Sequence, residues 1–152
     1  MADRREHAVA TAQAYHQGNI AGLDDAMTRP LEGRVALVTG VGRRIAIGAA
    51  IARRLAGDGA AVVVHSWVPH DAEQPWGADP GGLEAVVAEV RAAGGRAEHV
   101  SADLADPDAP ARVVAAVRRE FGHVDVVVAN HARSGAQNLE QLTADELDRC
   151  HA

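Results

Sequence analysis

The stretch that decides the fold is RVALVTGVGRRIAIG, residues 34–48. It opens with an apolar run up to Thr39, which predicts a buried strand, and a helix is predicted to follow over 47–57. Gly40 and Gly42 lie between the two elements. A glycine turn at this place lets a phosphate group approach backbone N–H groups at a helix N-terminus, and a Cβ would block that approach. The stretch therefore predicts a turn that binds the pyrophosphate of a dinucleotide.

The spacing of the turn narrows its ligand class. It is not a plain G-x-G-x-x-G, because Ile45 stands at the third glycine position. A P-loop is excluded, because that motif requires a lysine and all 15 basic residues are arginine. A methyltransferase turn would usually follow an acidic residue, and Val38 and Thr39 stand there instead.

The rest of the chain alternates strand and helix patterns, which indicates right-handed crossovers and a parallel sheet. We expect an α/β fold with a parallel sheet of about four strands. The predicted strands are 34–39, 61–65, 97–101 and 124–129; the predicted helices are 47–57, 83–93, 107–121 with a proline near its first turn, and one from Leu139 to Arg149 with Thr143 as N-cap. Residues 66–80 are expected to be a long loop.

Composition supports one cytoplasmic domain. The chain of 152 residues is 47% hydrophobic but only 3% aromatic, so the core must consist of Ala, Val, Leu and Ile, which suits buried parallel strands. The net charge of −6 argues against nucleic acid as a partner. Cys150 is the only cysteine, so neither an internal disulfide nor a zinc site is expected, and we expect no metal. No apolar run suggests a membrane span or a signal peptide.

The first 30 residues differ from the rest. They are polar, carry no strand pattern, and are expected to be an N-terminal extension that is disordered or lies outside the true coding sequence, with Met27 as the real start. Residues 31–152 are expected to form a partial dinucleotide-binding domain.

Three signatures together resemble the short-chain dehydrogenase/reductase family over residues 31–152. That family carries Thr-Gly-x-x-x-Gly-x-Gly at the turn, and this chain resembles a variant with two extra residues and Ala46 at the middle glycine. Asp103-Leu104 resembles its adenine-contacting pair, and the stretch at 130–133 resembles its Asn-Asn-Ala-Gly, whose first Asn steadies the sheet. The resemblance implies a Rossmann-type fold, a doubly wound parallel sheet that is truncated after about four strands in the order 3-2-1-4. It also implies cofactor contacts from Gly40, Gly42, Arg43, Arg44, Ile47, Gly48, Asp103, Leu104, Asn130, His131 and Ala132. His131 is also consistent with a loop histidine without a chemical role.

The sequence favours NADP(H) over NAD(H). An NAD site usually has an acidic residue at the end of the second strand, where this chain has Val64-His65-Ser66-Trp67. Arg43 and Arg44 in the turn could pair with a 2′-phosphate. The alternative is that both arginines are simply solvated.

The family's catalytic Ser, Tyr and Lys are not identified in this chain. Tyr15 is the only tyrosine and there is no lysine, so a Tyr-x-x-x-Lys pair cannot be formed, and no catalytic residue is assigned. We expect a fragment of an oxidoreductase that acts on a small carbonyl or alcohol and is homo-oligomeric at full length. We also expect poor solubility, because the fourth strand would be an exposed apolar edge. The alternatives are a non-catalytic dinucleotide-binding module, or a Rossmann domain for a nucleotide sugar or S-adenosylmethionine.

Overall fold

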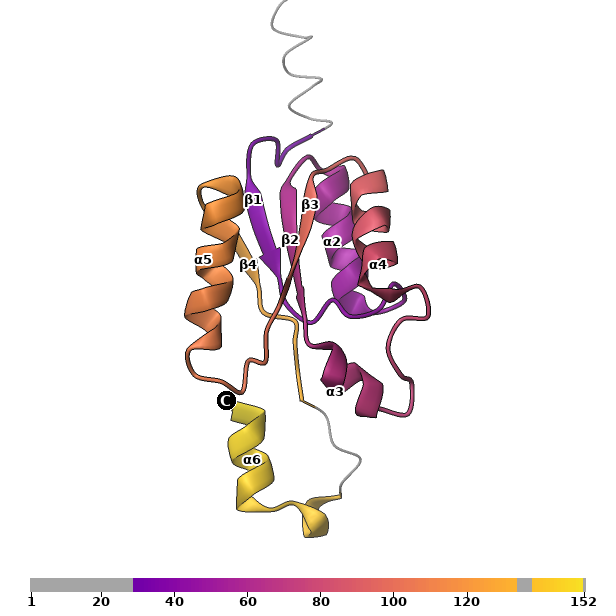
Figure 1. The fold of residues 1–152 in the computed structure, drawn as a ribbon, viewed down its shortest axis with the longest axis vertical. Helices are drawn as coiled ribbons and strands as arrows, with labels where there is room; N and C mark the ends of the chain where they lie inside the picture. Colours follow the sequence, from indigo (N-terminus) through magenta and orange to yellow (C-terminus); the bar gives the residue numbers. More distant parts are fainter. Residues whose placement is uncertain (1–28, 134–137, 152) are drawn as a thin grey trace, which may run out of the picture.

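The structure, a computed structural model, describes residues 29–133 and 138–151. Four parallel strands form one sheet in the order β3-β2-β1-β4, as predicted (Figure 1). Their bounds are β1 (Val35–Val38), β2 (Ala61–Ser66), β3 (Ala97–Ser101) and β4 (Val126–Val128). Val38 at the end of β1 pairs with Val64 of β2 on one side and Val128 of β4 on the other. The carboxyl ends of these three strands therefore meet at one edge of the sheet.

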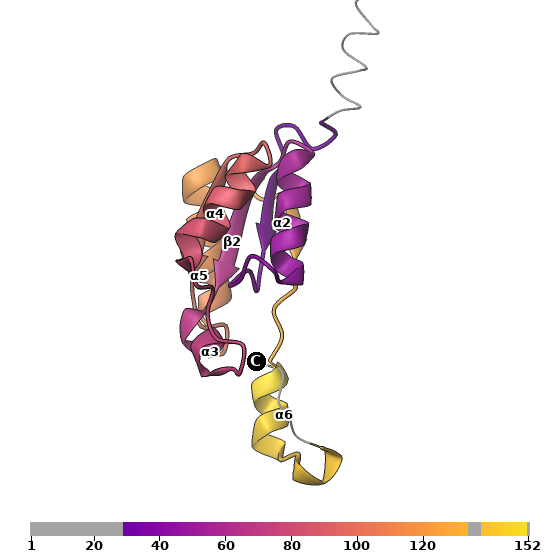
Figure 2. The ribbon, with the colours of Figure 1, turned by 90° about the vertical axis from the view of Figure 1, so that its right-hand side faces the viewer.

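Helices cover both faces of the sheet, as in a doubly wound fold. The helices α2 (Ile47–Gly57) and α4 (Gly82–Ala92) lie on one face, and α5 (Ala109–Phe121) lies on the other (Figures 1 and 2). Ala49, Ala52 and Ala56 are fully buried between α2 and the sheet. Their small side chains let α2 approach the strands closely, which fixes the position of its first turn.

The predicted loop over 66–80 was wrong in one respect, because it contains a helix. The helix α3 (Val68–Glu73) has a proline in its first turn and lies beyond the carboxyl ends of the strands (Figure 1). A proline there costs no helical hydrogen bond and presets the backbone dihedral. The sequence Trp67-Val68-Pro69 thus carried a helix-start signal in a segment whose composition suggested a loop.

Two other predicted boundaries also shift. The helix α5 begins at Ala109 and its first-turn proline is Pro110, because Asp106 closes a turn through the backbone N–H of Ala109 before the helix starts. The predicted helix from Leu139 divides into the 3₁₀ turn η1 (Leu139–Gln141) and α6 (Ala144–His151). Thr143 accepts a hydrogen bond from the Glu146 backbone N–H at 3.3 Å, which confirms it as the N-cap of α6.

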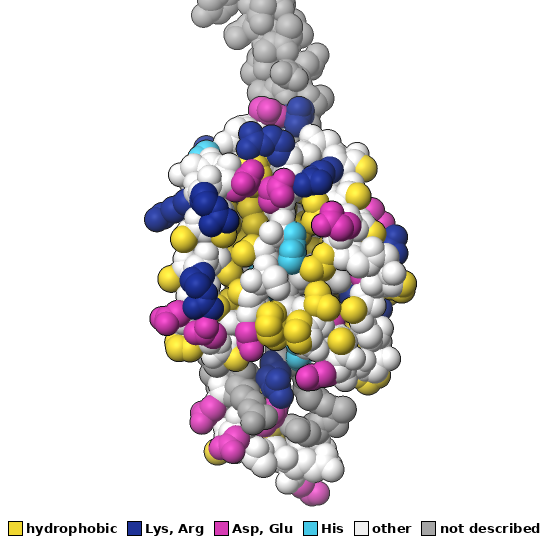
Figure 3. All heavy atoms as spheres, viewed as in Figure 1, with side chains coloured by type: hydrophobic (Ala, Val, Ile, Leu, Met, Phe, Trp, Pro, Cys, Tyr) yellow, Lys and Arg dark blue, Asp and Glu magenta, His cyan; other side chains and the backbone are white. Residues whose placement is uncertain are grey.

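The edge strand β4 is shorter than predicted. The Asp125 carboxylate accepts the backbone N–H of Val35 at 2.8 Å. A side chain thus takes the place of the backbone acceptor that a longer β4 would supply, just before the residues of β4 that pair with β1. Val127 in the middle of β4 is 60% exposed. In the view of Figure 3, hydrophobic side chains cross the middle of the molecule and charged side chains surround them.

The expected N-terminal extension lies, up to residue 28, outside the described residues. Leu31 donates its backbone N–H to the Asp58 carbonyl at 2.8 Å and packs against the core beside α2. Within residues 29–133 and 138–151, no helix is long and apolar enough to cross a membrane.

Candidate functional site

The candidate site begins with Gly40, directly after β1. Its φ of +71° lies in the left-handed region that favours glycine. A Cβ on Gly40 would come within 2.7 Å of the His131 Cα and 3.1 Å of the Asn130 amide nitrogen. Both the backbone conformation and the space therefore require glycine, and the chain after β4 packs directly against the turn.

Hydrogen bonds of Thr39 and Asn130 hold this turn against the end of β4. The buried Thr39 hydroxyl accepts the backbone N–H groups of Asn130 at 3.1 Å and His131 at 3.3 Å. It also lies 2.8 Å from His131 Nδ1. The Asn130 side-chain amide donates to the carbonyls of Thr39 at 3.0 Å and Gly40 at 3.2 Å. Asn130 thus occupies a position from which it can steady the sheet edge beside a bound ligand.

Gly48 brings the first turn of α2 against the same amide. A Cβ there would lie 2.7 Å from Asn130 Nδ2 and 2.8 Å from the Gly40 carbonyl oxygen. Ala46, which stands where the family has a glycine, precedes α2 with φ −80° and ψ 160°, an extended conformation open to any residue. No side chain among the described residues caps α2. The N–H groups of its first turn are therefore available to an anion.

The two arginines of the turn have different surroundings. Arg44 is held by Asp79: its backbone N–H donates to Asp79 Oδ2 at 2.9 Å, and its Nε and Nη2 each lie 3.0 Å from Asp79 Oδ1. The hydrogen bonds from Arg44 lower the pKa of Asp79 to about 2. The Arg43 guanidinium makes no hydrogen bond or ion pair with any residue that the structure describes, although its charge lowers the pKa of the nearby Asp71. Of the two predicted phosphate-binding side chains, Arg44 is thus already occupied and Arg43 is available.

Asp71 is a site residue that the sequence reasoning missed. From α3, its carboxylate lies against Gly42, in the space that a Cβ on that glycine would occupy. Burial raises the pKa of Asp71, and the charges of His70 and Arg43 lower it. The helix-start signal at Pro69, followed by an acidic residue, was the sequence feature that could have revealed it.

The strand β2 ends without an acidic side chain. The His65 side chain is buried and its Nε2 lies 3.0 Å from the Ala102 carbonyl oxygen, while its Nδ1 has no hydrogen-bond partner in the described part of the chain. Ser66 is hydrogen-bonded to His99 Nε2 at 2.9 Å. Burial lowers the pKa of both His65 and His99. No carboxylate of β2 itself therefore reaches the site.

The remaining predicted residues lie around this edge. Ile47 is 74% exposed at the start of α2, and His131 and Ala132 are exposed after β4. Asp103, after β3, accepts the backbone N–H of Ala105 at 3.0 Å, while Leu104 packs into the core beside α5. The structure thus brings together the turn, the start of α2 and residues 130–132, with Asp103 and Leu104 at the end of β3.

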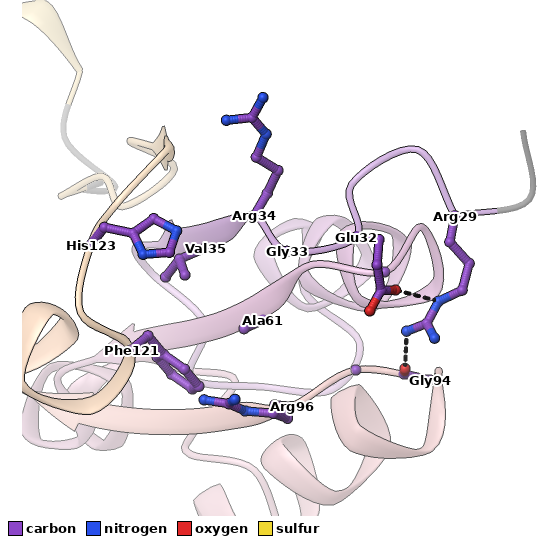
Figure 4. A pocket seen from close by; sticks show the side chains of 12 residues that line it. Arg29, Glu32, Gly33, Arg34, Val35, Ala61, Gly94, Arg96, Phe121 and His123 are labelled. Carbon is purple, nitrogen blue, oxygen red and sulfur yellow. Dashed lines mark hydrogen bonds and ion pairs between the residues drawn. The ribbon is translucent and has the colours of Figure 1, made fainter. Parts of the chain in front are cut away.

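A separate pocket of about 380 Å³ opens at the amino ends of the strands, the opposite edge of the sheet (Figure 4). Its arginines already have partners: Arg29 pairs with Glu32 at 3.0 Å and donates to the Gly94 carbonyl, and Arg96 stacks over Phe121 at 4.6 Å. Since none of the predicted site residues line it, we do not include it in the site. Among the described residues, no group of His, Cys, Asp and Glu could hold a metal ion.

Comparisons with known proteins agree with this geometry. The short chain dehydrogenase family model matches residues 34–152. Versicolorin reductase 1 of Aspergillus parasiticus is 40% identical over 119 residues, which are 78% of this chain and 41% of that reductase. A short chain dehydrogenase from Burkholderia cenocepacia, solved in complex with NADP, is 40% identical with a TM-score of 0.63 and covers 79% of this chain and 44% of its own.

A short-chain dehydrogenase/reductase from Serratia marcescens is 37% identical with a TM-score of 0.65, over 80% of this chain and 44% of that one. The chain thus spans about two fifths of the length of the curated relatives it matches, 41% for versicolorin reductase 1.

Proposed function

The chain belongs to the short-chain dehydrogenase family, and on that premise we propose that its glycine turn binds NADP(H) in an oxidoreductase that transfers hydride between the nicotinamide and a small carbonyl or alcohol. The observation that carries the proposal is the turn itself. Gly40 is left-handed, packs against Asn130 and His131, and leads to the uncapped start of α2. Such a turn offers backbone N–H groups to a pyrophosphate.

The proposed contacts follow from this arrangement. The backbone around Gly40 and Gly42 and the first turn of α2 would hold the pyrophosphate, and Asn130 would keep the turn in place through its bonds to Thr39 and Gly40. Ile47, Asp103, Leu104, His131 and Ala132 would line the nucleoside ends. When bound, the dinucleotide supplies the hydride, and the protein supplies orientation and electrostatics.

NADP(H) is proposed over NAD(H) for two reasons. Ser66 and His65 end β2 without a carboxylate that would accept the ribose 2′-OH or repel a 2′-phosphate. The Arg43 guanidinium has no hydrogen-bond or ion-pair partner among the described residues, so it can pair with a 2′-phosphate. The Burkholderia cenocepacia relative was solved with NADP, which supports the same choice. The cytoplasmic location and the homo-oligomeric state expected from the sequence belong to this proposal as well.

Calorimetric titration of the 152-residue chain with NADP⁺ and with NAD⁺ tests the proposal. The chain should bind NADP⁺ more tightly, and Arg43→Ala should weaken NADP⁺ binding by about tenfold or more, because a charge-assisted hydrogen bond is lost. NAD⁺ binding should change by less than about twofold. Arg54→Ala is the matched control, since Arg54 lies on α2 with a side chain that is 79% exposed. Equal loss for both cofactors would contradict the role of Arg43.

A non-catalytic dinucleotide-binding module is the second candidate, and one observation favours it. The 152 residues contain no lysine and a single tyrosine, Tyr15, so the proton-transfer pair of the family is not among them. Oxidation of NADPH by this chain with a panel of aldehydes and ketones would favour the proposal that the chain itself is an active enzyme. Binding without turnover would favour the module.

A further inference from the structure

The segment from Trp67 to Gly81 contacts the glycine turn at two points. At one end, the Asp79 carboxylate takes the backbone N–H and the guanidinium of Arg44 and also the backbone N–H of Gly81 at 2.8 Å. At the other end, the Asp71 carboxylate lies against Gly42. The two carboxylates differ in one respect: Asp79 has an ion-pair partner, whereas the Asp71 carboxylate makes no hydrogen bond or ion pair with a described residue and feels only the charges of His70 and Arg43.

Asp71 occupies space that the proposed ligand needs. The second glycine of a dinucleotide turn is small so that the pyrophosphate can approach the backbone. Gly42 stands at the second glycine position of the G-x-G-x-x-G spacing. It is buried, and the Asp71 Cγ lies 2.9 Å from where its Cβ would stand. A carboxylate and a phosphate carry charge of the same sign and cannot share this position.

We propose that Asp71 sets the dinucleotide affinity of this chain, because its carboxylate takes the place of a phosphate over Gly42 in the free protein and must leave when the dinucleotide binds. This inference rests on the proposed function. The Arg44–Asp79 ion pair keeps the segment attached while α3 moves, so Asp79 is a positioning residue and Asp71 is the group that the ligand displaces. Burial raises the pKa of Asp71, although the charges of His70 and Arg43 lower it.

Substitution at Asp71 tests the inference. Asp71→Asn removes the charge at nearly constant size, and Asp71→Ala removes the group. Both should bind NADP⁺ and NAD⁺ at least about fivefold more tightly than the unmodified chain, because the pyrophosphate is common to both cofactors. Glu73→Gln is the matched control: it makes the same change of charge on the same helix, at an exposed position, and should change either affinity by less than about twofold.

The chain carries its own reporter for this experiment. Its two tryptophans, Trp67 and Trp76, both lie in the segment and are 38% and 49% exposed. Dinucleotide added to the unmodified chain should change their fluorescence. Thermal melting of each variant checks that it is folded.

The outcomes separate the two proposals. Tighter binding of both cofactors by the Asp71 variants, including binding where the unmodified chain shows none, supports the inference. Equal binding by the unmodified chain and the variants, or a gain with one cofactor alone, overturns it and leaves the proposed function standing. Binding by none of these folded proteins refutes the proposed function and the inference together.

Discussion

Removal of the Asp79 carboxylate should destabilise the fold, although Asp79 lies in a segment without strands. Its side chain is only 5% exposed and receives hydrogen bonds from the backbone N–H of Arg44 at 2.9 Å, from the Arg44 guanidinium at 3.0 Å and from the Gly81 N–H at 2.8 Å. Hydrogen bonds to a charged group contribute about 1.5–3 kcal/mol each. The Arg44 side chain is 37% exposed, so water replaces part of what is lost.

For Asp79→Ala we therefore expect a loss of about 2 kcal/mol in the free energy of unfolding. Urea denaturation followed by circular dichroism measures this loss, and the melting temperature should fall by roughly 5–10 °C. Arg44→Ala combined with Asp79→Ala completes a double-mutant cycle, whose coupling energy should be at least about 1 kcal/mol.

Glu98→Ala provides the comparison. Glu98 pairs with Arg91 at 2.9 Å, but both side chains are about half exposed, at 48% and 49%. Such a surface pair contributes about 0–1 kcal/mol. If Asp79→Ala costs no more than Glu98→Ala, or if the cycle shows no coupling, the Arg44–Asp79 pair does not fasten the segment to the turn.

Two further predictions concern the turn and acid. Gly48→Ala should destabilise the chain by about 1–3 kcal/mol, because its Cβ would press on Asn130 and the Gly40 carbonyl. Gly57→Ala at the end of the same helix has its nearest neighbour at 3.5 Å and should be neutral or stabilising in the same denaturation assay. Destabilisation by Gly57→Ala alone would contradict the packing argument. The pKa of Asp79 is about 2, below its ordinary value of 3.8, so the stabilising contribution of its carboxylate is complete above pH 3.8 and is lost as the pH falls towards 2. The difference in the free energy of unfolding between the unmodified chain and Asp79→Asn should therefore shrink as the pH falls from 3.8 to 2. A constant difference would contradict the assignment.

The order of elements could be read from the sequence because each signal is local. The main signals all lie within one strand and the helix after it. They are the apolar run before Thr39, the glycines of the turn and the small-residue face of α2. Their alternation with further strands then left few topologies, because parallel crossovers are right-handed. The observed order β3-β2-β1-β4 is the one that the family resemblance implied.

The need for glycine in the turn could be predicted from the approach of a cofactor, but the packing contacts that also require glycine could not. Gly40 and Gly48 were predicted to lie near a cofactor, and the structure shows that both also pack against Asn130, about 80–90 residues away in the chain. The sequence contains these residue types, whereas their contact depends on β4 pairing with β1.

The roles of the charged residues were decided by tertiary structure alone. Arg43 and Arg44 are neighbours in sequence and look equivalent, but Arg44 meets Asp79, 35 residues away, and Arg43 does not. Asp71 reaches Gly42 only because α3 folds back across the ends of the strands. Hydrophobic periodicity specifies elements and their buried faces, since burial of apolar area is nondirectional and repeats along the chain. An ion pair depends on where two distant side chains finally lie, and no periodic pattern encodes that distance.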